Sequence, residues 1–240
     1  MQMLNDVKRV AQFSWAMFRY NMKIIFGGKF IYFFLAGMVA YLLGVGGDIY
    51  WGKPTDLSDV FHYLMFPAVL LVFYPSAFGV QNDMDQRTVE ILFTIPNYRF
   101  KVWLVRLFIA NVLVFLIIYL LAYLTQFLLM GVPYFELSMQ LMIPVFFLST
   151  FAFMVSTRTR SGLGTAIIVV IVAFAFFVVY QNSPKTPYQI FFNPYRVIKD
   201  MHQLVWENAK FNNRLYLLVG SFMCLLYGLM NLQKREKFKI

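Results

Sequence analysis

Five of the chain's few charged side chains lie in one short stretch, residues 81–99, QNDMDQRTVEILFTIPNYR. Asp83, Asp85, Arg87 and Glu90 fall within eight residues of each other there, and long apolar runs lie on both sides. Acids are favoured in the first turn of a helix, where the positive end of the helix dipole lies. Asp83–Arg87 and Arg87–Glu90 have the i,i+4 and i,i+3 spacings of helical ion pairs. The pattern predicts a short helix with a charged face.

The sequence contains a start signal and a stop signal for this predicted helix. Asn82 can act as its N-cap, and Pro96 cannot continue it. We therefore predict an amphipathic helix over 82–95 at a membrane surface, joined to an apolar run on each side. A helix placed in this way could transmit a push on its polar face to two spans. The alternative interpretation is a re-entry hairpin whose charges only keep it out of the membrane.

No catalytic or metal constellation accompanies this stretch in the sequence. The chain has no G-x-x-x-x-G-K-[ST] loop, and no apolar run holds a pair of acids, a Ser–His or Ser–Lys pair, or a His-Glu-x-x-His motif. His62 and His202 have no second ligand at a metal-like spacing, and Cys224 is the single cysteine. We predict that the chain is not an enzyme and binds neither a metal nor another cofactor itself.

The composition is that of a protein whose solvent is lipid. Of the 240 residues, 60% are hydrophobic and only 13% are charged, about half the share of an average soluble domain. A spanning helix needs about 20 mostly apolar residues. Six runs without Asp, Glu, Lys or Arg meet or nearly meet that length: 30–47, 60–82, 107–135, 137–157, 161–184 and 215–233. They are continuous rather than alternating, which favours helices over barrel strands. The sequence predicts an all-α membrane protein of six transmembrane helices, forming one domain over 1–240.

The basic residues predict the orientation of these spans. Six spans place both termini on one side, and 15 of the 21 Lys and Arg residues then fall on that side. By the positive-inside rule we assign both termini and residues 81–106 to the cytoplasm. The net charge of +10 is therefore attributed to topology and not to nucleic acid. In residues 5–28 the basic side chains fall on one helical face and the apolar ones near the other. This pattern predicts an interfacial amphipathic helix before the first span.

Three further segments carry predictions about the outer side and the interior of the spans. Residues 185–213 are too charged to span, and we predict a helical outer segment there with Asn193 as N-cap and Pro194 at its first position. The Phe-rich stretch 174–180 is expected to be a packing or lipid face. The polar residues of the third and fourth spans either join helices by hydrogen bonds or line a substrate path: Asn111, Thr125, Gln126, Ser149 and Thr150.

The sequence RTVEILFTIPNYRFKVWLVRLF resembles the cytoplasmic segment of type-2 ABC exporter permeases. In that family an acidic stretch precedes Gly-Thr-x-Glu, two hydrophobic residues, a proline and then a basic residue. Thr88 and Glu90 match the Thr-x-Glu, Pro96 matches the proline, and Arg99 matches the basic residue. Arg87 stands where the family usually has Gly. The six spans, the interfacial helix and the outer segment are similar to the members grouped with gliding-motility and copper-enzyme-maturation permeases.

This resemblance implies the permease subunit of an ABC transporter in the bacterial inner membrane. Two such subunits, identical or paralogous, would form a dimer on a pair of cytoplasmic ATPases that bind ATP and Mg²⁺. The helix over 82–95 would be the coupling helix, with Asp83, Asp85, Arg87, Thr88, Glu90, Pro96 and Arg99 at the ATPase contact. A path without charged residues favours export of an amphiphilic or lipid-linked substrate. A membrane scaffold for an ATPase and an ion-coupled carrier remain alternatives, the latter weakened because the spans lack acids.

Overall fold

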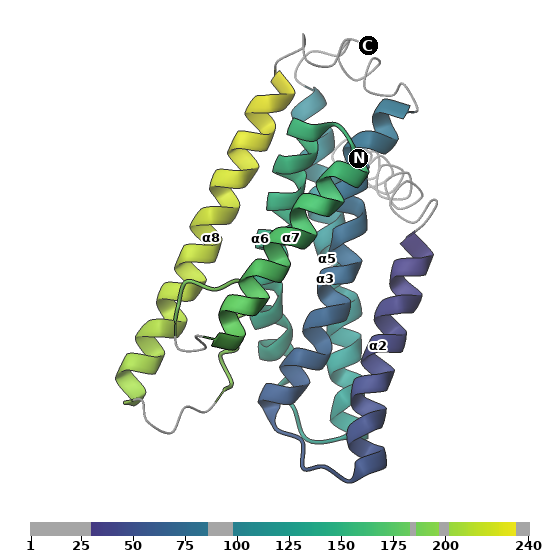
Figure 1. Cartoon of the computed structure of the whole chain (residues 1–240). Coiled ribbons are helices and arrows are strands. Elements are labelled where there is room, and N and C mark those ends of the chain that lie inside the picture. The colour runs from purple at the N-terminus through teal and green to yellow at the C-terminus, as the bar shows by residue number, and fades with distance from the viewer. Residues whose placement is uncertain (1–29, 86–97, 183–185, 197–201, 234–240) are drawn as a thin grey trace, which may run out of the picture.

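The computed structural model describes residues 30–85, 98–182, 186–196 and 202–233 and consists of long helices (Figure 1). Every one of these helices is long and apolar enough to cross a membrane. The described residues contain no strand. The prediction of an all-α protein with six spans is confirmed, and the chain is a multi-pass membrane protein. The helices are α2 (Phe30–Trp51), α3 (Leu57–Asp85), α5 (Tyr98–Leu128), α6 (Tyr134–Thr159), α7 (Gly162–Asn182) and α8 (Gln203–Gln233).

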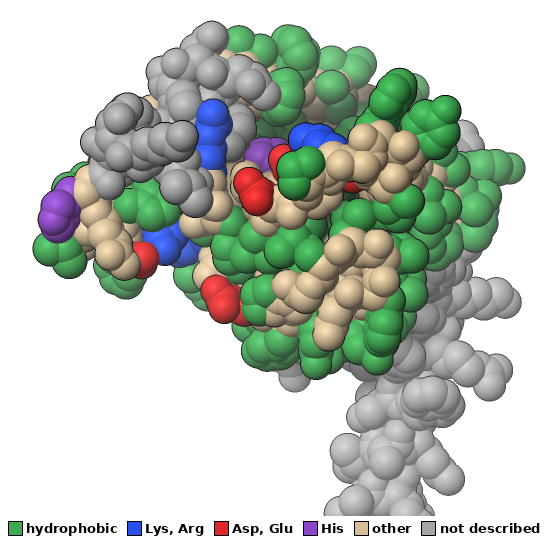
Figure 2. Space-filling view, turned by 90° about the horizontal axis from the view of Figure 1, so that it is seen from below, with side chains coloured by type: hydrophobic (Ala, Val, Ile, Leu, Met, Phe, Trp, Pro, Cys, Tyr) green, Lys and Arg blue, Asp and Glu red, His purple; other side chains and the backbone are tan. Residues whose placement is uncertain are grey.

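The helices run alternately up and down, so the bundle has two distinct ends. At the first end, called here the Phe30 end, α2, α5 and α7 begin and α3, α6 and α8 end; it is uppermost in Figure 1. The opposite end is called the Trp51 end. Figure 2 shows the Trp51 end, where acidic, basic and histidine side chains gather among hydrophobic ones. Charged side chains thus gather at this end of the bundle, as expected for helices surrounded by hydrocarbon.

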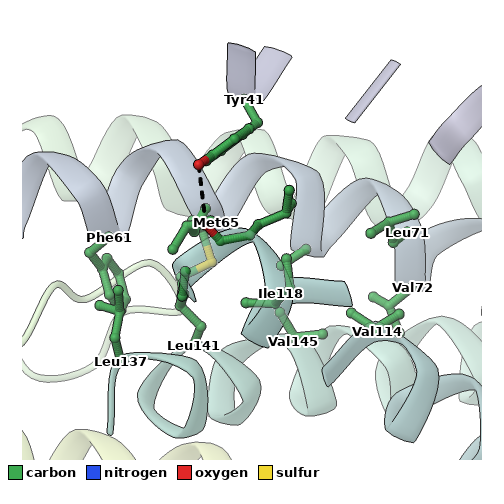
Figure 3. Packing of buried hydrophobic residues seen from close by; sticks show 14 of the residues in the cluster. Tyr41, Phe61, Met65, Leu71, Val72, Val114, Ile118, Leu137, Leu141 and Val145 are labelled. Atoms are coloured by element: carbon green, nitrogen blue, oxygen red, sulfur yellow. Dashed lines mark hydrogen bonds between the residues drawn. The ribbon is translucent and has the colours of Figure 1, made fainter. Parts of the chain in front are cut away.

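The centre of the bundle is the pair α3 and α6. These two helices pack against each other, α5 and α7 each contact both, α2 packs on α3 and α8 packs on α6. A continuous cluster of buried side chains joins α2, α3, α5 and α6, with Ile118, Leu137 and Leu141 fully enclosed (Figure 3). The outer faces of α2, α7 and α8 remain largely exposed and apolar, which suits contact with lipid.

Two predicted boundaries differ from the structure. Helix α3 continues through Asp85, so Asn82 lies inside this helix and is not the N-cap of a new one. Helix α8 begins at Gln203 and runs without interruption to Gln233. Residues 203–213 of the predicted outer segment are therefore the first third of the last span. The charged residues at the start of α8 continue the apolar helix, so the uncharged run alone does not predict where this helix begins.

The predicted helix at Pro194 is also not present over 194–196. Asn193 instead opens a turn, because its Oδ1 accepts a hydrogen bond from the Tyr195 backbone N–H at 2.9 Å. Its Nδ2 donates to the carbonyl and hydroxyl oxygens of Ser58, each at 3.0 Å. A side chain that satisfies distant partners in this way fixes the 186–196 loop on α3. The predicted interfacial helix over 5–28 lies outside the described residues.

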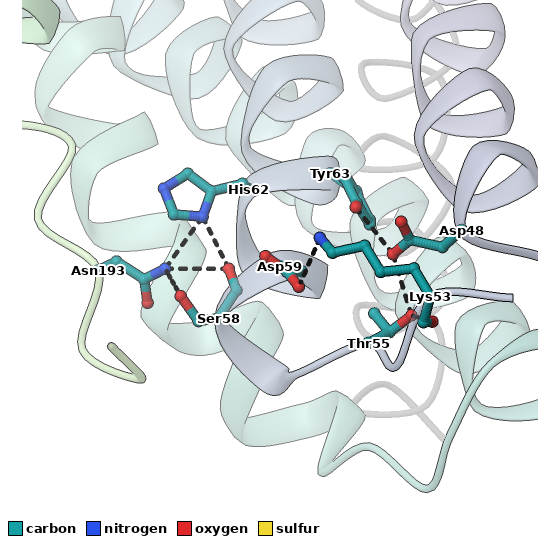
Figure 4. A network of polar contacts seen from close by, with 8 residues as sticks. All are labelled: Asp48, Lys53, Thr55, Ser58, Asp59, His62, Tyr63 and Asn193. Carbon is teal, nitrogen blue, oxygen red and sulfur yellow. Dashed lines mark hydrogen bonds and ion pairs between the residues drawn. The ribbon is translucent and has the colours of Figure 1, made fainter. Parts of the chain in front are cut away.

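A polar clamp at the Trp51 end fixes α2 to α3 (Figure 4). The carboxylate of Asp48, buried near the end of α2, accepts hydrogen bonds from Tyr63 Oη at 2.8 Å and Thr55 Oγ1 at 2.9 Å. Lys53 and Asp59 form an ion pair at 3.3 Å beside it. The ring of Tyr63 lies against Gly44, where a Cβ atom would be 2.7 Å from Tyr63 Cδ1.

Replacing Gly44 by Val is expected to destabilise the protein by about 1–3 kcal/mol, the usual cost of overpacking. The Tyr63 ring cannot swing away without losing its hydrogen bond to Asp48. Thermal unfolding in detergent measures the effect. Gly46→Val is the matched control, since Gly46 is in the same helix and a Cβ atom added to it would meet no other atom within 4 Å. Equal melting temperatures for the two variants would contradict this account of the helix contact.

Candidate functional site

A polar cluster in the middle of the bundle joins three helices. Ser76 of α3 and Ser149 of α6 are hydrogen-bonded through their Oγ atoms at 3.0 Å. Asn111 of α5 donates from Nδ2 to Ser149 Oγ at 3.0 Å and to the Leu107 carbonyl at 2.8 Å. Asn111 Oδ1 has no hydrogen-bond partner among the described residues. Two of the five predicted path residues thus meet, and the cluster holds helices together.

The other predicted path residues do not join this cluster. Thr125 is buried and its hydroxyl bonds Tyr41 Oη at 2.9 Å, which ties α2 to α5. Thr150 bonds the carbonyls of Phe146 and Phe147 in its own helix. Gln126 is exposed. The buried side chains of this set form hydrogen bonds within and between helices, and a substrate path lined by them stays a prediction.

The residues predicted to contact an ATPase lie at the Phe30 end, as far as they are described. Asp83 and Asp85 are in the last turn of α3 and Arg99 is in the first turn of α5. Arg87, Thr88, Glu90 and Pro96 lie outside the described residues. The chain between α3 and α5 is therefore connected directly to the central helix of the bundle.

The end of α3 is also in contact with the turn between α6 and α7. The backbone N–H of Gly162, the first residue of α7, donates to Gln81 Oε1. A Cβ atom at Gly162 would overlap the Phe78 ring and this same amide oxygen. The turn is held in shape by Arg160, whose left-handed backbone (φ 56°) caps α6 through a bond from its N–H to the Ser156 carbonyl. A displacement of the end of α3 must therefore act on the start of α7.

An apolar cavity lies between α3 and α7 toward the Trp51 end. Its volume is about 410 Å³, within the range of small-molecule sites. A second cavity of about 130 Å³ adjoins it, and both are lined by Val69, Val170 and Ala173. The larger cavity is lined in addition by Phe61, His62, Met65, Phe66, Phe174, Phe177 and Phe191. Together the two form one groove along α3, which we call the α3–α7 groove.

The length of the α3–α7 groove matches one leaflet of a bilayer. Its lining on α3 extends from Phe61 to Phe73, and twelve residues of helix correspond to about 18 Å. The hydrocarbon core of a membrane is about 30 Å thick, so one leaflet contributes about 15 Å. A groove of this length, parallel to the helices and lined almost entirely by carbon, suits a single hydrocarbon chain.

Polar groups mark only the Trp51 end of this groove. His62 Nδ1 lies 2.7 Å from the Ser58 carbonyl oxygen and 3.1 Å from Asn193 Nδ2 (Figure 4). His62 is exposed. The arrangement can therefore receive a molecule with a polar head at the interface and an apolar tail toward the bilayer centre.

The α3–α7 groove was not predicted from the sequence. The stretch 174–180 was expected to face lipid or neighbouring helices, yet Phe174 and Phe177 line the cavity wall while keeping large exposed surfaces. The available signal was the recurrence of aromatic and large apolar residues on one face of 61–73. That signal is the same for a packed core and for a groove, because only the neighbouring helix decides whether the face is filled.

Comparison with known proteins identifies no relative of this chain. No family model matches the chain, and neither the curated proteins nor the solved structures contain a significant match.

Proposed function

We propose that this chain is the transmembrane subunit of an ATP-driven exporter of the type-2 ABC class. The observation that supports this most is the place of α3 (Leu57–Asp85). One end of this helix carries Asp83 and Asp85 and leads into the stretch that resembles a coupling segment. The other end forms one wall of the α3–α7 groove. A single rigid element thus connects a candidate ATPase contact to a candidate ligand site.

The second wall of the groove is connected to the same end. Helix α7 begins at Gly162, which is bonded to Gln81 of α3. A partner that pushes on the chain between α3 and α5 would move the end of α3 and, through this contact, the start of α7. The groove would then widen or narrow as a two-state element biased by the nucleotide state of the partner. ATP and Mg²⁺ are bound by that partner and not by this chain.

The proposed topology places the Phe30 end in the cytoplasm. The support is the charge count of the sequence: with this topology 15 of the 21 Lys and Arg residues fall on the cytoplasmic side, among them Arg106, Arg158 and Arg160. The groove then opens toward the outer leaflet of a bacterial inner membrane. The proposed cargo is an amphiphile with at least one hydrocarbon chain, since the groove lining offers no charged side chain to replace the hydration of an ion.

The proposal is tested by purifying the chain in nanodiscs together with candidate ABC ATPases from the same organism. We expect recovery of a complex containing two ATPases and two permease subunits, with ATP turnover that depends on the permease. A chain that recovers no nucleotide-binding partner would contradict the proposal and favour an ion-coupled carrier. Recovery of an ATPase whose turnover never moves an amphiphile would favour a scaffold.

A further inference from the structure

Arg214 of α8 is a partly buried cation whose described hydrogen-bond partners are neutral. Its Nε donates to Gln140 Oε1 of α6 at 2.8 Å, and its Nη1 donates to Asn213 Oδ1 at 3.2 Å. Its Nη2 is buried and has no hydrogen-bond acceptor among the described residues. Guanidinium carries five N–H donors, so at least one nitrogen of this group has its donors unused inside the protein.

The acids described near Arg214 do not neutralise it. Ion pairs between described residues are Lys53–Asp59 and Lys210–Glu207, and neither includes Arg214. Glu136, one turn from Gln140 on α6, instead accepts a hydrogen bond from Tyr195 Oη at 3.4 Å. Burial, followed by the Glu136 carboxylate, raises the pKa of the Tyr195 phenol well above its ordinary range. Tyr195 therefore stays protonated and supplies no negative charge.

The depth of Arg214 in the bundle points to the bilayer interface. Its partner Gln140 is six residues from the start of α6, about 9 Å along the helix. Tyr134 and Trp206, aromatic side chains of the type that mark membrane interfaces, lie nearer that end on the same two helices. A lipid headgroup zone adds roughly 5–7 Å on each side of the hydrocarbon core, which places a phosphate group within reach of a long arginine side chain.

We propose that Arg214 is the centre of an oxyanion site at the Trp51 end, between α6, α8 and the 186–196 loop, which takes the phosphate group of an anionic amphiphile. A planar guanidinium matches two phosphate oxygens at once and is less strongly hydrated than an ammonium group. A charge with no ion-pair partner among the described residues is costly at this depth, and ionisable residues within spans are usually functional. The inference does not depend on the proposed ATPase coupling.

The test compares the full-length wild-type chain with Arg214→Gln and Arg214→Lys in a neutral detergent, using thermal unfolding. The added probes are phosphatidylglycerol, phosphatidylcholine and inorganic phosphate. Lys210→Gln is the matched control, because it removes one positive charge from the same helix at a residue that already has its own partner, Glu207, at 2.6 Å. A ligand that binds only the folded state raises the melting temperature, because it adds RT ln(1 + [L]/Kd) to the free energy of unfolding, where [L] is the free ligand concentration.

We expect phosphatidylglycerol to stabilise the wild type and Lys210→Gln more than phosphatidylcholine does. Arg214→Gln should weaken phosphatidylglycerol binding by more than about tenfold, as for loss of one partner of a buried charge pair. Without added anion, Arg214→Gln should be at least as stable as the wild type, because it removes an unneutralised charge. A residue that only anchors α8 to α6 would instead destabilise the protein under every condition when replaced.

Each remaining outcome either overturns the proposal or identifies the source of the anion that binds. Equal stabilisation by inorganic phosphate alone would keep the site and assign it to a soluble anion. The proposal would be overturned if neither phosphatidylglycerol nor inorganic phosphate stabilised the wild type. Undiminished phosphatidylglycerol binding by the Arg214→Gln protein would overturn it as well. If Arg214→Gln does not fold, Arg214→Lys is used instead. An ammonium group cannot form the bidentate contact of a guanidinium with two phosphate oxygens, so binding should weaken severalfold. Unchanged binding would overturn the proposed site.

Discussion

Changing Asp83 and Glu90 together to Lys should reduce recovery of the ATPase with this chain to background, a loss of more than about tenfold. The two acids belong to the segment predicted to contact the ATPase, and each reversal would replace an attraction across that contact by a repulsion. Like charges brought together at an interface cost several kcal/mol, and each 1.4 kcal/mol is a factor of ten. Co-purification from nanodiscs, scored as ATPase per permease, measures the loss.

The control for this experiment is Glu207→Lys. Glu207 is an exposed acid on α8 at the opposite, Trp51 end, where the proposed ATPase does not bind. Its reversal should leave ATPase recovery unchanged. Elution volume and melting temperature of the Asp83/Glu90 variant establish that the spans remain folded. A folded double variant that recovers ATPase like the wild type would contradict the assignment of this stretch as the coupling segment.

Replacing Ala173 by Trp should abolish occupancy of the α3–α7 groove. Ala173 lines both cavities, and it is only half-buried, so an indole ring at this position can enter the groove without displacing a packed core. Binding of a fluorescent long-chain amphiphile to the purified chain should weaken by more than about tenfold, since apolar contact along the chain contributes roughly 25 cal/mol for each Å² buried. In proteoliposomes containing the ATPase, movement of the amphiphile should fall in parallel.

Ala175→Trp provides the matched control for the groove. Ala175 is two residues further along the same helix, is exposed, and lines neither of the two cavities. The same indole placed there should leave amphiphile binding at the wild-type level. Weaker binding in both variants would mean that a bulky side chain disturbs α7 in general. Wild-type binding by Ala173→Trp would show that the groove is not the site.

Much of the architecture follows from the sequence because a membrane leaves few choices. Backbone polar groups must be satisfied within each span, so continuous uncharged runs become helices. The six helices were predicted in number and order for this reason. The ends of the helices were less well predicted, because each predicted span ended at the first charged residue. Helix α3 continues past Asn82 to Asp85, and α8 begins at Gln203, eleven residues before Arg214.

The sequence by itself determined the membrane character and the six helices, and the segregation of most basic residues to one end stays a prediction. Only the tertiary structure decided which side chains meet. Ser149 contacts Ser76 and Asn111 from two other helices, whereas Thr150 next to it bonds its own backbone. Adjacent residues on a helix point about 100° apart, so their partners depend on the crossing of neighbouring helices. The same crossings leave the space between α3 and α7. They also bring Arg214 beside Gln140, where it forms no ion pair with any described acid.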